Sequence, residues 1–425
     1  MEHSTAVTGS GDGSRRVGIA IVGLGGAVAT TAAAGVELLR LGATAVDGLP
    51  LAEATVVGAD GTSRSVADVA GLVDYTALYF AGWDLAADDL AKASEVHRVL
   101  DASQHDAVAS ALSSVTPWPG IGNPEFCRGI GGDHRLGAPT HRDAVAAITA
   151  DMERFRVESS LDGLVVVNLA STERRLDLGL DVLASVDAFE AGLDADDPNI
   201  GPAQLYAYAA IRGGVPYANF TPSVAADVPA LVALAEQLEV PIAGKDGKTG
   251  QTMLKTVIAP GLRSRALRVE GWYSANILGN RDGEALDDPD SLASKIDTKG
   301  SVLDSVLGYH VEDHVVTINY YRPRGDAKEA WDNIDLIGFL GQRMQLKVNF
   351  LCKDSILAAP LVLEIARVLD CAVRRGDGGV QEQLSLFFKA PMTPAGGTPE
   401  HALLRQEQHL MDWLLAPVEQ SLTSG

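Results

Sequence analysis

A short apolar segment, followed at once by glycines and then by a helix-forming stretch, constrains this chain more than any other feature. Val17–Val22 is continuously apolar, the next residues are GLGG from Gly23, and residues 27–41 are rich in alanine and other strong helix formers. A buried strand, a glycine turn and a helix form the opening unit of a doubly wound parallel sheet, where the turn and the helix N-terminus face a dinucleotide pyrophosphate. The sequence therefore predicts an α/β fold with a dinucleotide site at this turn.

The glycine fingerprint is incomplete. Val28 stands where a third glycine is usual, and the turn alone is also compatible with an ordinary strand-to-helix connection. The carboxylate that binds the cofactor ribose usually follows the second strand, about 20 residues on. Asp60 comes somewhat late for this role, and Asp84 competes with it.

Alternating strand and helix patterns extend this unit. Apolar segments predict strands at 54–58, 77–80, 163–169, 215–220 and 240–243, and helical patterns occupy 85–103, 140–153 and 225–237. Such alternation is typical of a mostly parallel sheet covered by helices. Residues 119–139 are rich in glycine and proline and predict a long loop, which makes them a functional candidate.

The pattern changes from Asp246 onwards. Lysines and polar residues become frequent, and residues 315–321 and 344–351 alternate as antiparallel strands do. We expect a second domain here that presents a sheet and carries chemistry. Residues 355–369 and 402–415 predict helices that return to the first domain.

The charge and the cysteine and histidine content of the chain limit what it is expected to bind. The formal net charge is −22, so the sequence predicts neither nucleic acid nor a membrane as a partner, because both select basic surfaces. The three cysteines form no CxxC and the nine histidines form no HExxH, so we expect no metal site. The chain lacks an uncharged apolar run of the ~18 residues that span a membrane, and its first 14 residues lack the apolar stretch of a signal peptide. We therefore expect a cytoplasmic protein.

Several lysines lie where they could bind an anion. The segment GKDGKTGQT from Gly244 follows a predicted strand and suits a turn that donates N–H and hydroxyl bonds, although a surface turn has a similar composition. Lys295 and Lys299 are four residues apart, so they share a helical face and repel each other unless an anion lies between them. Lys328 is isolated, and Lys389 follows an apolar stretch, which places its ammonium at the edge of a buried site.

Ten ordered segments carry a resemblance to a known family. They are GLGG from Gly23, GWD from Gly82, STER from Ser171, GVP from Gly214, GKDGKTGQT from Gly244, NILGNRDG from Asn276, SKxxxK ending at Lys299, GDAK ending at Lys328, KDSILAAP from Lys353 and LFFKAP around Lys389. In these motifs the sequence resembles inositol-3-phosphate synthase, also called myo-inositol-1-phosphate synthase. The motif sequences are closer to those of a bacterial branch of the family. The family often has two asparagines where this chain has Ala27 and Val28, so a side-chain contact there is lost.

The resemblance implies a Rossmann-type doubly wound parallel sheet with an inserted α+β catalytic and tetramerisation domain. In this division residues 1–14 are a disordered tail, 15–245 plus 350–425 form the NAD-binding domain, and 246–349 form the catalytic and oligomerisation domain. The implied assembly is a homotetramer.

The resemblance also implies roles for individual residues. NAD contacts would come from Gly23, Gly25, Gly26, Ala27, Asp84, Thr172, Asp246, Thr249, Asn280, Asp282, Lys295, Gly325, Asp326, Asp354 and Ser355. The sugar phosphate would contact Thr249, Gly250, Gln251, Thr252, Asn276, Lys299, Lys328 and Lys389. The catalytic set would be Lys295, Lys299, Lys328, Lys389, Asp246 and Asn276.

The implied activity is an internal redox cyclisation. Glucose 6-phosphate would be oxidised at C5, enolised, closed by an intramolecular aldol step and reduced again, giving 1D-myo-inositol 3-phosphate with NAD as cofactor. The motifs leave open a relative that closes a five-membered cyclitol phosphate from fructose 6-phosphate, and a non-catalytic NAD-binding regulator. They also leave open whether a monovalent or divalent cation assists.

Overall fold

A large parallel sheet forms the centre of the protein in the computed structural model, which describes residues 15–58, 60–127, 131–279, 302–394 and 397–416. Its strand order is β13-β8-β7-β6-β1-β4-β5, and every neighbouring pair is parallel. The strands are β1 (Val17–Val22), β4 (Leu78–Asp84), β5 (Trp118–Pro119), β6 (Gly163–Asn168), β7 (Tyr217–Asn219), β8 (Pro241–Gly244) and β13 (Gly379–Val380). The order reverses beside β1, between β1 and β6. This is the doubly wound arrangement that the sequence predicted, and it confirms the fold class.

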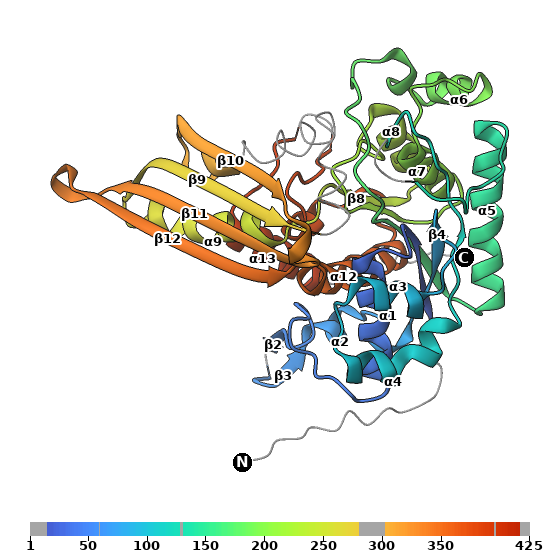
Figure 1. Cartoon of the computed structure of the whole chain (residues 1–425), viewed down its shortest axis with the longest axis horizontal. Helices are drawn as coiled ribbons and strands as arrows, with labels where there is room; N and C mark the ends of the chain where they lie inside the picture. Colours follow the sequence, from blue (N-terminus) through green and yellow to red (C-terminus); the bar gives the residue numbers. More distant parts are fainter. Residues whose placement is uncertain (1–14, 59, 128–130, 280–301, 395–396, 417–425) are drawn as a thin grey trace.

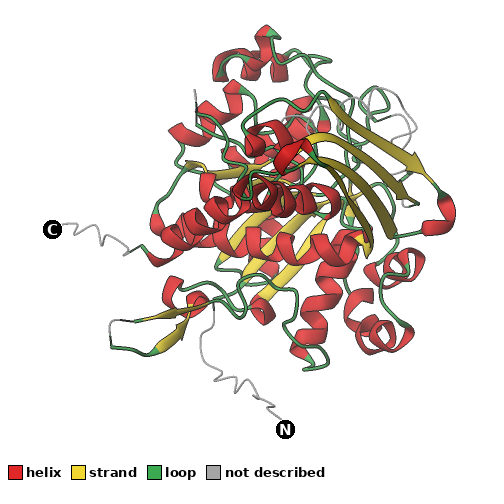
Figure 2. Cartoon of the chain, turned by 90° about the vertical axis from the view of Figure 1, so that its left-hand side faces the viewer, coloured by secondary structure: helices red, strands yellow, loops and turns green. Residues whose placement is uncertain are grey.

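Helices cover both faces of this sheet (Figures 1 and 2). One layer contains α1 (Ala27–Arg40), α4 (Ala102–Ser113), α12 (Asp354–Arg375) and α13 (Leu403–Leu415), and the other contains α5 (His141–Glu158), α7 (Pro202–Arg212) and α8 (Pro229–Gln237). Successive residues of a strand point to opposite faces, so Ile19 and Ile21 of β1 join the first core and Ala20 and Val22 the second. A strand buried on both faces has to be continuously apolar, which explains the sequence of β1.

Two predicted elements of the first domain differ in the structure. The helix predicted at 85–103 is the shorter α3 (Leu90–His97), because Arg98 adopts a left-handed conformation and Asp101 then caps a new helix, α4, with Gln104. The strand predicted at 54–58 is β2 (Thr55–Val57), but it lies outside the large sheet. It pairs antiparallel with β3 (Ser63–Ser65) in a separate hairpin before the short helix α2 (Val66–Ala70).

A second sheet of four strands projects from this body (Figure 1). Its order is β10-β9-β11-β12, formed by β9 (Arg268–Leu278), β10 (Asp313–Tyr320), β11 (Ala327–Ile337) and β12 (Arg343–Lys353). β12 is antiparallel to β11, as predicted, but β10 is parallel to β9. The expectation of an antiparallel β10 was wrong, because residue alternation identifies a strand without fixing its direction.

The helix α9 (Gly250–Ser264) covers one face of the second sheet. Ala259 and Leu262 of this helix share an apolar cluster with Trp272 and Ile334 of the sheet. The chain then returns to the first domain, since α12 packs on α1 and β6, and α13 packs on α2. Helix α6 (Val186–Asp194) completes the second layer of the first domain, against α8. Among the described residues, none of the helices combines the length and the apolar character that crossing a bilayer needs.

Candidate active site

A cavity of about 330 Å³ lies at the carboxyl edge of the large sheet, where the strand order reverses. Ligands of open α/β sheets bind at this position. The cavity is lined by the glycine turn after β1, by the end of β4, by residues 168–173 after β6, and by side chains from the inserted region and the C-terminal part, namely Asp246, Thr249, Lys328, Asp354, Ser355 and Lys389. Segments far apart in the sequence therefore meet in one pocket.

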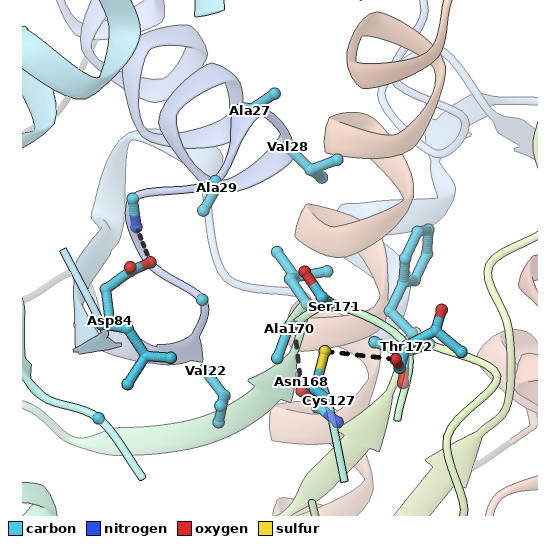
Figure 3. A pocket seen from close by; sticks show the side chains of 18 of the residues that line it. Val22, Ala27, Val28, Ala29, Asp84, Cys127, Asn168, Ala170, Ser171 and Thr172 are labelled. Atoms are coloured by element: carbon cyan, nitrogen blue, oxygen red, sulfur yellow. Dashed lines mark hydrogen bonds between the residues drawn. The ribbon is translucent and has the colours of Figure 1, made fainter. Parts of the chain in front are cut away.

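The glycine turn has the geometry of a phosphate cradle. Gly23 has a φ of +87°, and a Cβ at this position would lie 3.1 Å from backbone atoms of Ala170. Gly26 is the N-cap of α1 and offers no side-chain bond to the first turn of that helix. Ala27 and Val28, at the start of α1, line the cavity (Figure 3), and the first turn of this helix has no capping side chain. This arrangement fits the pyrophosphate of a dinucleotide.

Asp84 ends β4, the strand next to β1 on the adenosine side of such folds. Its Oδ2 accepts a 2.8 Å hydrogen bond from the N–H of Gly25, and its Oδ1 accepts one from Ala86 (Figure 3). Asp60 instead lies in the exposed β2–β3 hairpin, outside the residues that line the cavity. Of the two carboxylates considered, only Asp84 lines the cavity.

Two lysine–carboxylate pairs line the same cavity. Lys389 Nζ lies 2.7 Å from Asp246 Oδ1, and the two side chains are only 8% and 5% exposed. Lys328 Nζ lies 3.2 Å from Asp354 Oδ2, whose other oxygen accepts a 3.0 Å bond from Thr249 Oγ1. Buried ammonium groups next to a dinucleotide cradle can stabilise negative charge that develops on a ligand.

Other predicted residues lie beside the cavity or outside the described part. Asp326 accepts a 2.6 Å bond from Ser355 Oγ, and burial raises the pKa of this carboxyl. Gly250, Gln251, Thr252, Asn276, Gly325 and Asp326 are not among the residues that line the cavity. Asn280, Asp282, Lys295 and Lys299 lie outside the described residues.

Four residues of this region were not singled out from the sequence. His97 places Nε2 2.8 Å from the carbonyl oxygen of Gly25, and Cys127 Sγ contacts the carbonyl oxygen of Thr172 (Figure 3). Glu173 lies buried in the cavity wall, and Lys248 is buried against Gln406 of α13. Burial lowers the pKa of Lys248 to about 7. Only Glu173 and Lys248 belong to quoted motifs, and nothing local in the sequence marks His97 or Cys127.

Comparison with known proteins decides the family. The model of an NAD-binding family described as myo-inositol-1-phosphate synthase matches residues 17–415. The chain belongs to this family. This match confirms the family that the ten motifs predicted. The family is an NAD-binding one, which supports NAD as the cofactor.

Relatives of the myo-inositol-1-phosphate synthase family resemble the chain over nearly its whole length. Inositol-3-phosphate synthase 1 of Bacteroides thetaiotaomicron is 39% identical over 398 residues, covering 92% of this chain and 93% of the relative. The rice protein of the same name is 30% identical over 439 residues, covering 95% and 86%. The crystal structure of inositol-3-phosphate synthase from Caenorhabditis elegans superposes with a TM-score of 0.87 at 27% identity, covering 95% and 86%. The chain is therefore an enzyme of the inositol-3-phosphate synthase type, which favours this activity over the alternatives left open by the motifs.

Proposed function

We propose that this enzyme cyclises glucose 6-phosphate to 1D-myo-inositol 3-phosphate, with NAD held across the glycine turn. The observation that carries the proposal is the meeting of Lys328 and Lys389 with that turn in one cavity. NAD, when bound, supplies a hydride acceptor at a sugar carbon and a hydride donor once the ring is closed, so substrate and product have the same oxidation state.

The cofactor set follows the cavity wall. Gly23, Gly25 and Gly26 with the first turn of α1 would hold the pyrophosphate, and Asp84 the adenosine ribose. Further proposed cofactor contacts are Ala27, Thr172, Asp246, Thr249, Asn280, Asp282, Lys295, Gly325, Asp326, Asp354 and Ser355.

The lysines are proposed to act on oxygen atoms of the sugar. Enolisation and ring closure develop negative charge at C5 and C1 oxygens, and fixed ammonium groups in a water-poor site stabilise such charge. Lys295 and Lys389 take these two oxygens in the proposal, with Lys299 and Lys328 nearer the phosphate. Asp246 orients Lys389 through their 2.7 Å contact, as Asp354 does Lys328 at 3.2 Å.

The product identifies the reaction. Purified enzyme with NAD is given glucose 6-phosphate and, separately, fructose 6-phosphate, and the products are identified by NMR. We expect inositol phosphate from glucose 6-phosphate, and no net absorbance of NADH. Lys328→Met and Lys389→Met should each lower kcat about 100-fold or more while NAD still binds, whereas Lys92→Met, an exposed lysine of α3, should leave turnover unchanged. A five-membered ring from fructose 6-phosphate, or NADH released in proportion to substrate, contradicts the proposal.

Assembly, domain division and location are also proposals. We propose a homotetramer in the cytoplasm, with residues 246–349 as its catalytic and oligomerisation domain and 15–245 plus 350–425 as its NAD-binding domain. The face of the second sheet opposite α9 supports the assembly, because Tyr273, Val315, Trp331 and Leu351 are exposed there. An assisting cation lacks such support, since in the described ranges no three His, Cys, Asp or Glu side chains gather as metal ligands.

A further inference from the structure

A polar cluster is buried between α9 and the second sheet, near the part of the cavity that is lined by lysine. Its centre is Asp332 of β11, which is 3% exposed. Oδ1 of Asp332 accepts hydrogen bonds of 2.7 Å from Trp272 Nε1 and from Ser274 Oγ, and Gln251 Nε2 lies 3.2 Å from each carboxylate oxygen. An indole N–H can only donate, so this carboxylate oxygen is an acceptor.

Lys255 of α9 supplies positive charge to the cluster. Its Nζ lies over the ring of Trp272 and 2.7 Å from Nε2 of His314. Burial lowers the pKa of Lys255 to about 8 and Asp332 opposes that shift, while burial and Lys255 together lower the pKa of His314 to about 4. At neutral pH a charged Lys255 therefore donates to a neutral His314 and balances the charge of Asp332. This contact ties His314 of β10 to α9.

The carboxylate fixes the orientation of two amides in succession. Gln251 must turn its NH₂ towards Asp332, since its carbonyl oxygen would be repelled there. Its Oε1 then faces Asn276 and accepts a hydrogen bond from Asn276 Nδ2. The other polar atom of this amide, Asn276 Oδ1, has no hydrogen-bond partner among the described residues. The Asn276 side chain is only 1% exposed. A buried acceptor without a donor is costly unless a ligand supplies one.

This acceptor lies next to the cavity. Asn276 pairs with Ala330 across the β9–β11 ladder, and Leu278 pairs with Lys328. Asn276 and Lys328 are thus diagonal neighbours on the face covered by α9, about 7–8 Å apart between Cα atoms. Lys328 lines the cavity, so Asn276 neighbours a residue of the cavity wall.

We propose that Asp332 is a positioning residue, which through Gln251 holds Asn276 with Oδ1 directed to a hydroxyl of the sugar phosphate. The inference rests on the proposed function, because it gives the substrate hydroxyl as the missing donor. Asp332 does not contact the substrate in this arrangement. With Asn276 held in this orientation the site accepts a hydrogen bond from the ligand, whereas a rotated amide would donate one. The site therefore selects a polyol over an analogue that lacks the hydroxyl.

The test compares binding of glucose 6-phosphate to the NAD-loaded enzyme by calorimetry. Asp332→Asn puts an amide at position 332, and its NH₂ group meets the NH₂ group of Gln251. Gln251 then turns over, and Asn276 turns with it. We expect the Kd of this variant for glucose 6-phosphate to rise about tenfold, with NAD affinity unchanged. Asp335→Asn is the matched control, because Asp335 lies on the same strand but bonds Asn333 and Gln345 instead. Its Kd should stay within about twofold of the wild type.

A charge-swap variant separates orientation from simple destabilisation. In Asp332→Asn combined with Gln251→Glu, the new carboxylate accepts from both the amide at 332 and Asn276 Nδ2, so Asn276 keeps its orientation. The double variant should regain part of the lost affinity, with a Kd at least about threefold below that of Asp332→Asn. An unchanged Kd in Asp332→Asn overturns the inference, and so does a double variant that binds as weakly as the single one.

Three further outcomes bear on the inference or on the proposed function. If Asp332→Asn does not fold, the double variant decides alone, and a Kd raised more than about tenfold overturns the inference. A wild-type enzyme that binds glucose 6-phosphate but forms no inositol phosphate removes the proposed function and leaves the binding comparison valid. A wild-type enzyme that binds no sugar phosphate at all overturns the inference as well.

Discussion

Glu173 shows what burial does to one carboxyl group in the cavity wall. It is 7% exposed, its Oε1 accepts a 2.9 Å bond from the N–H of Ala203, and its Oε2 has no partner among the described residues. Burial raises the pKa of Glu173 from its ordinary 4.5 to about 7. The folded state therefore holds a proton more tightly than the unfolded chain does. This contribution to stability is complete below about pH 4.5 and is lost as the pH rises through about 7.

Glu173→Gln removes that dependence, since an amide does not titrate in this range. Relative to the wild type, the unfolding free energy of the variant should increase by about 2 kcal/mol between pH 5 and pH 8. Urea unfolding of both proteins, without NAD, at the two pH values measures the difference. Glu236→Gln on the exposed side of α8 is the control and should show no such change. An equal response of Glu173→Gln and the wild type to pH would contradict the assignment.

At the scale of single residues, the sequence predicted positions better than partners. Lys389 was expected at the edge of a buried site because an apolar stretch precedes it, and it is buried there. Its partner Asp246 lies 143 residues away, a pairing that spacing alone does not provide. Asp84 was weighed against Asp60, and the two differ in that Asp84 lines the cavity at the end of β4 while Asp60 lies in the β2–β3 hairpin. Asp332 has no local signal, because its three hydrogen-bonding partners are 58 to 81 residues distant.

At the scale of elements, the β1 and β4 strands explain why glycine recurs in the motifs. Gly82 pairs with Ile21 at a φ of +152°, and a Cβ there would lie 2.0 Å from the Ile21 carbonyl oxygen. The GWD motif thus joins a close contact between strands with Asp84, which bonds the glycine turn. Strand β1 and the turn could be predicted because local pattern determines both. The direction of β10 could not be predicted, since it depends on residues outside the strand itself.

Two glycine substitutions should have opposite effects. Gly82→Ala forces β1 and β4 apart and should lower the unfolding free energy by about 3 kcal/mol or more, with loss of NAD binding. Gly35 lies inside α1, where a Cβ would meet no atom within 4 Å. Gly35→Ala should therefore raise the unfolding free energy by about 0.5–1 kcal/mol and leave NAD binding intact. Thermal unfolding with and without NAD measures both, and a tolerated Gly82→Ala would show that the strands are not in close contact.

At the scale of the whole molecule, the chain leaves the large sheet and returns to it. After β8 it builds α9 and the second sheet, and α12 begins directly where β12 ends and carries the chain back to β13. Lys353 at this junction donates a 2.6 Å bond to the carbonyl oxygen of Val99 in the first domain. The excursion is what brings Lys328 and Asp354 to the cavity formed by the glycine turn.

The outer face of the second sheet exposes apolar side chains in the described part of the chain. Val315 pairs with Tyr273, and Leu351 pairs with Glu329, two residues from Trp331, so the ladders place all four apolar side chains on the face opposite α9. Tyr273, Trp331 and Leu351 are 49%, 48% and 60% exposed. An exposed apolar patch rich in aromatic residues is typical of a protein interface. We therefore expect a second copy of the chain to pack on this face in the proposed tetramer.

Trp331→Glu tests this packing directly, because it places a charge at the centre of the face without touching the cavity or the core. Multi-angle light scattering after size exclusion should give the mass of four chains for the wild type and a smaller species for the variant, at micromolar concentration. Leu404→Glu, on the exposed side of α13, is the control for a new surface charge and should keep the wild-type mass. If Trp331→Glu also keeps that mass, the tetramer is held by another surface, and the second sheet has its apolar face for a different reason.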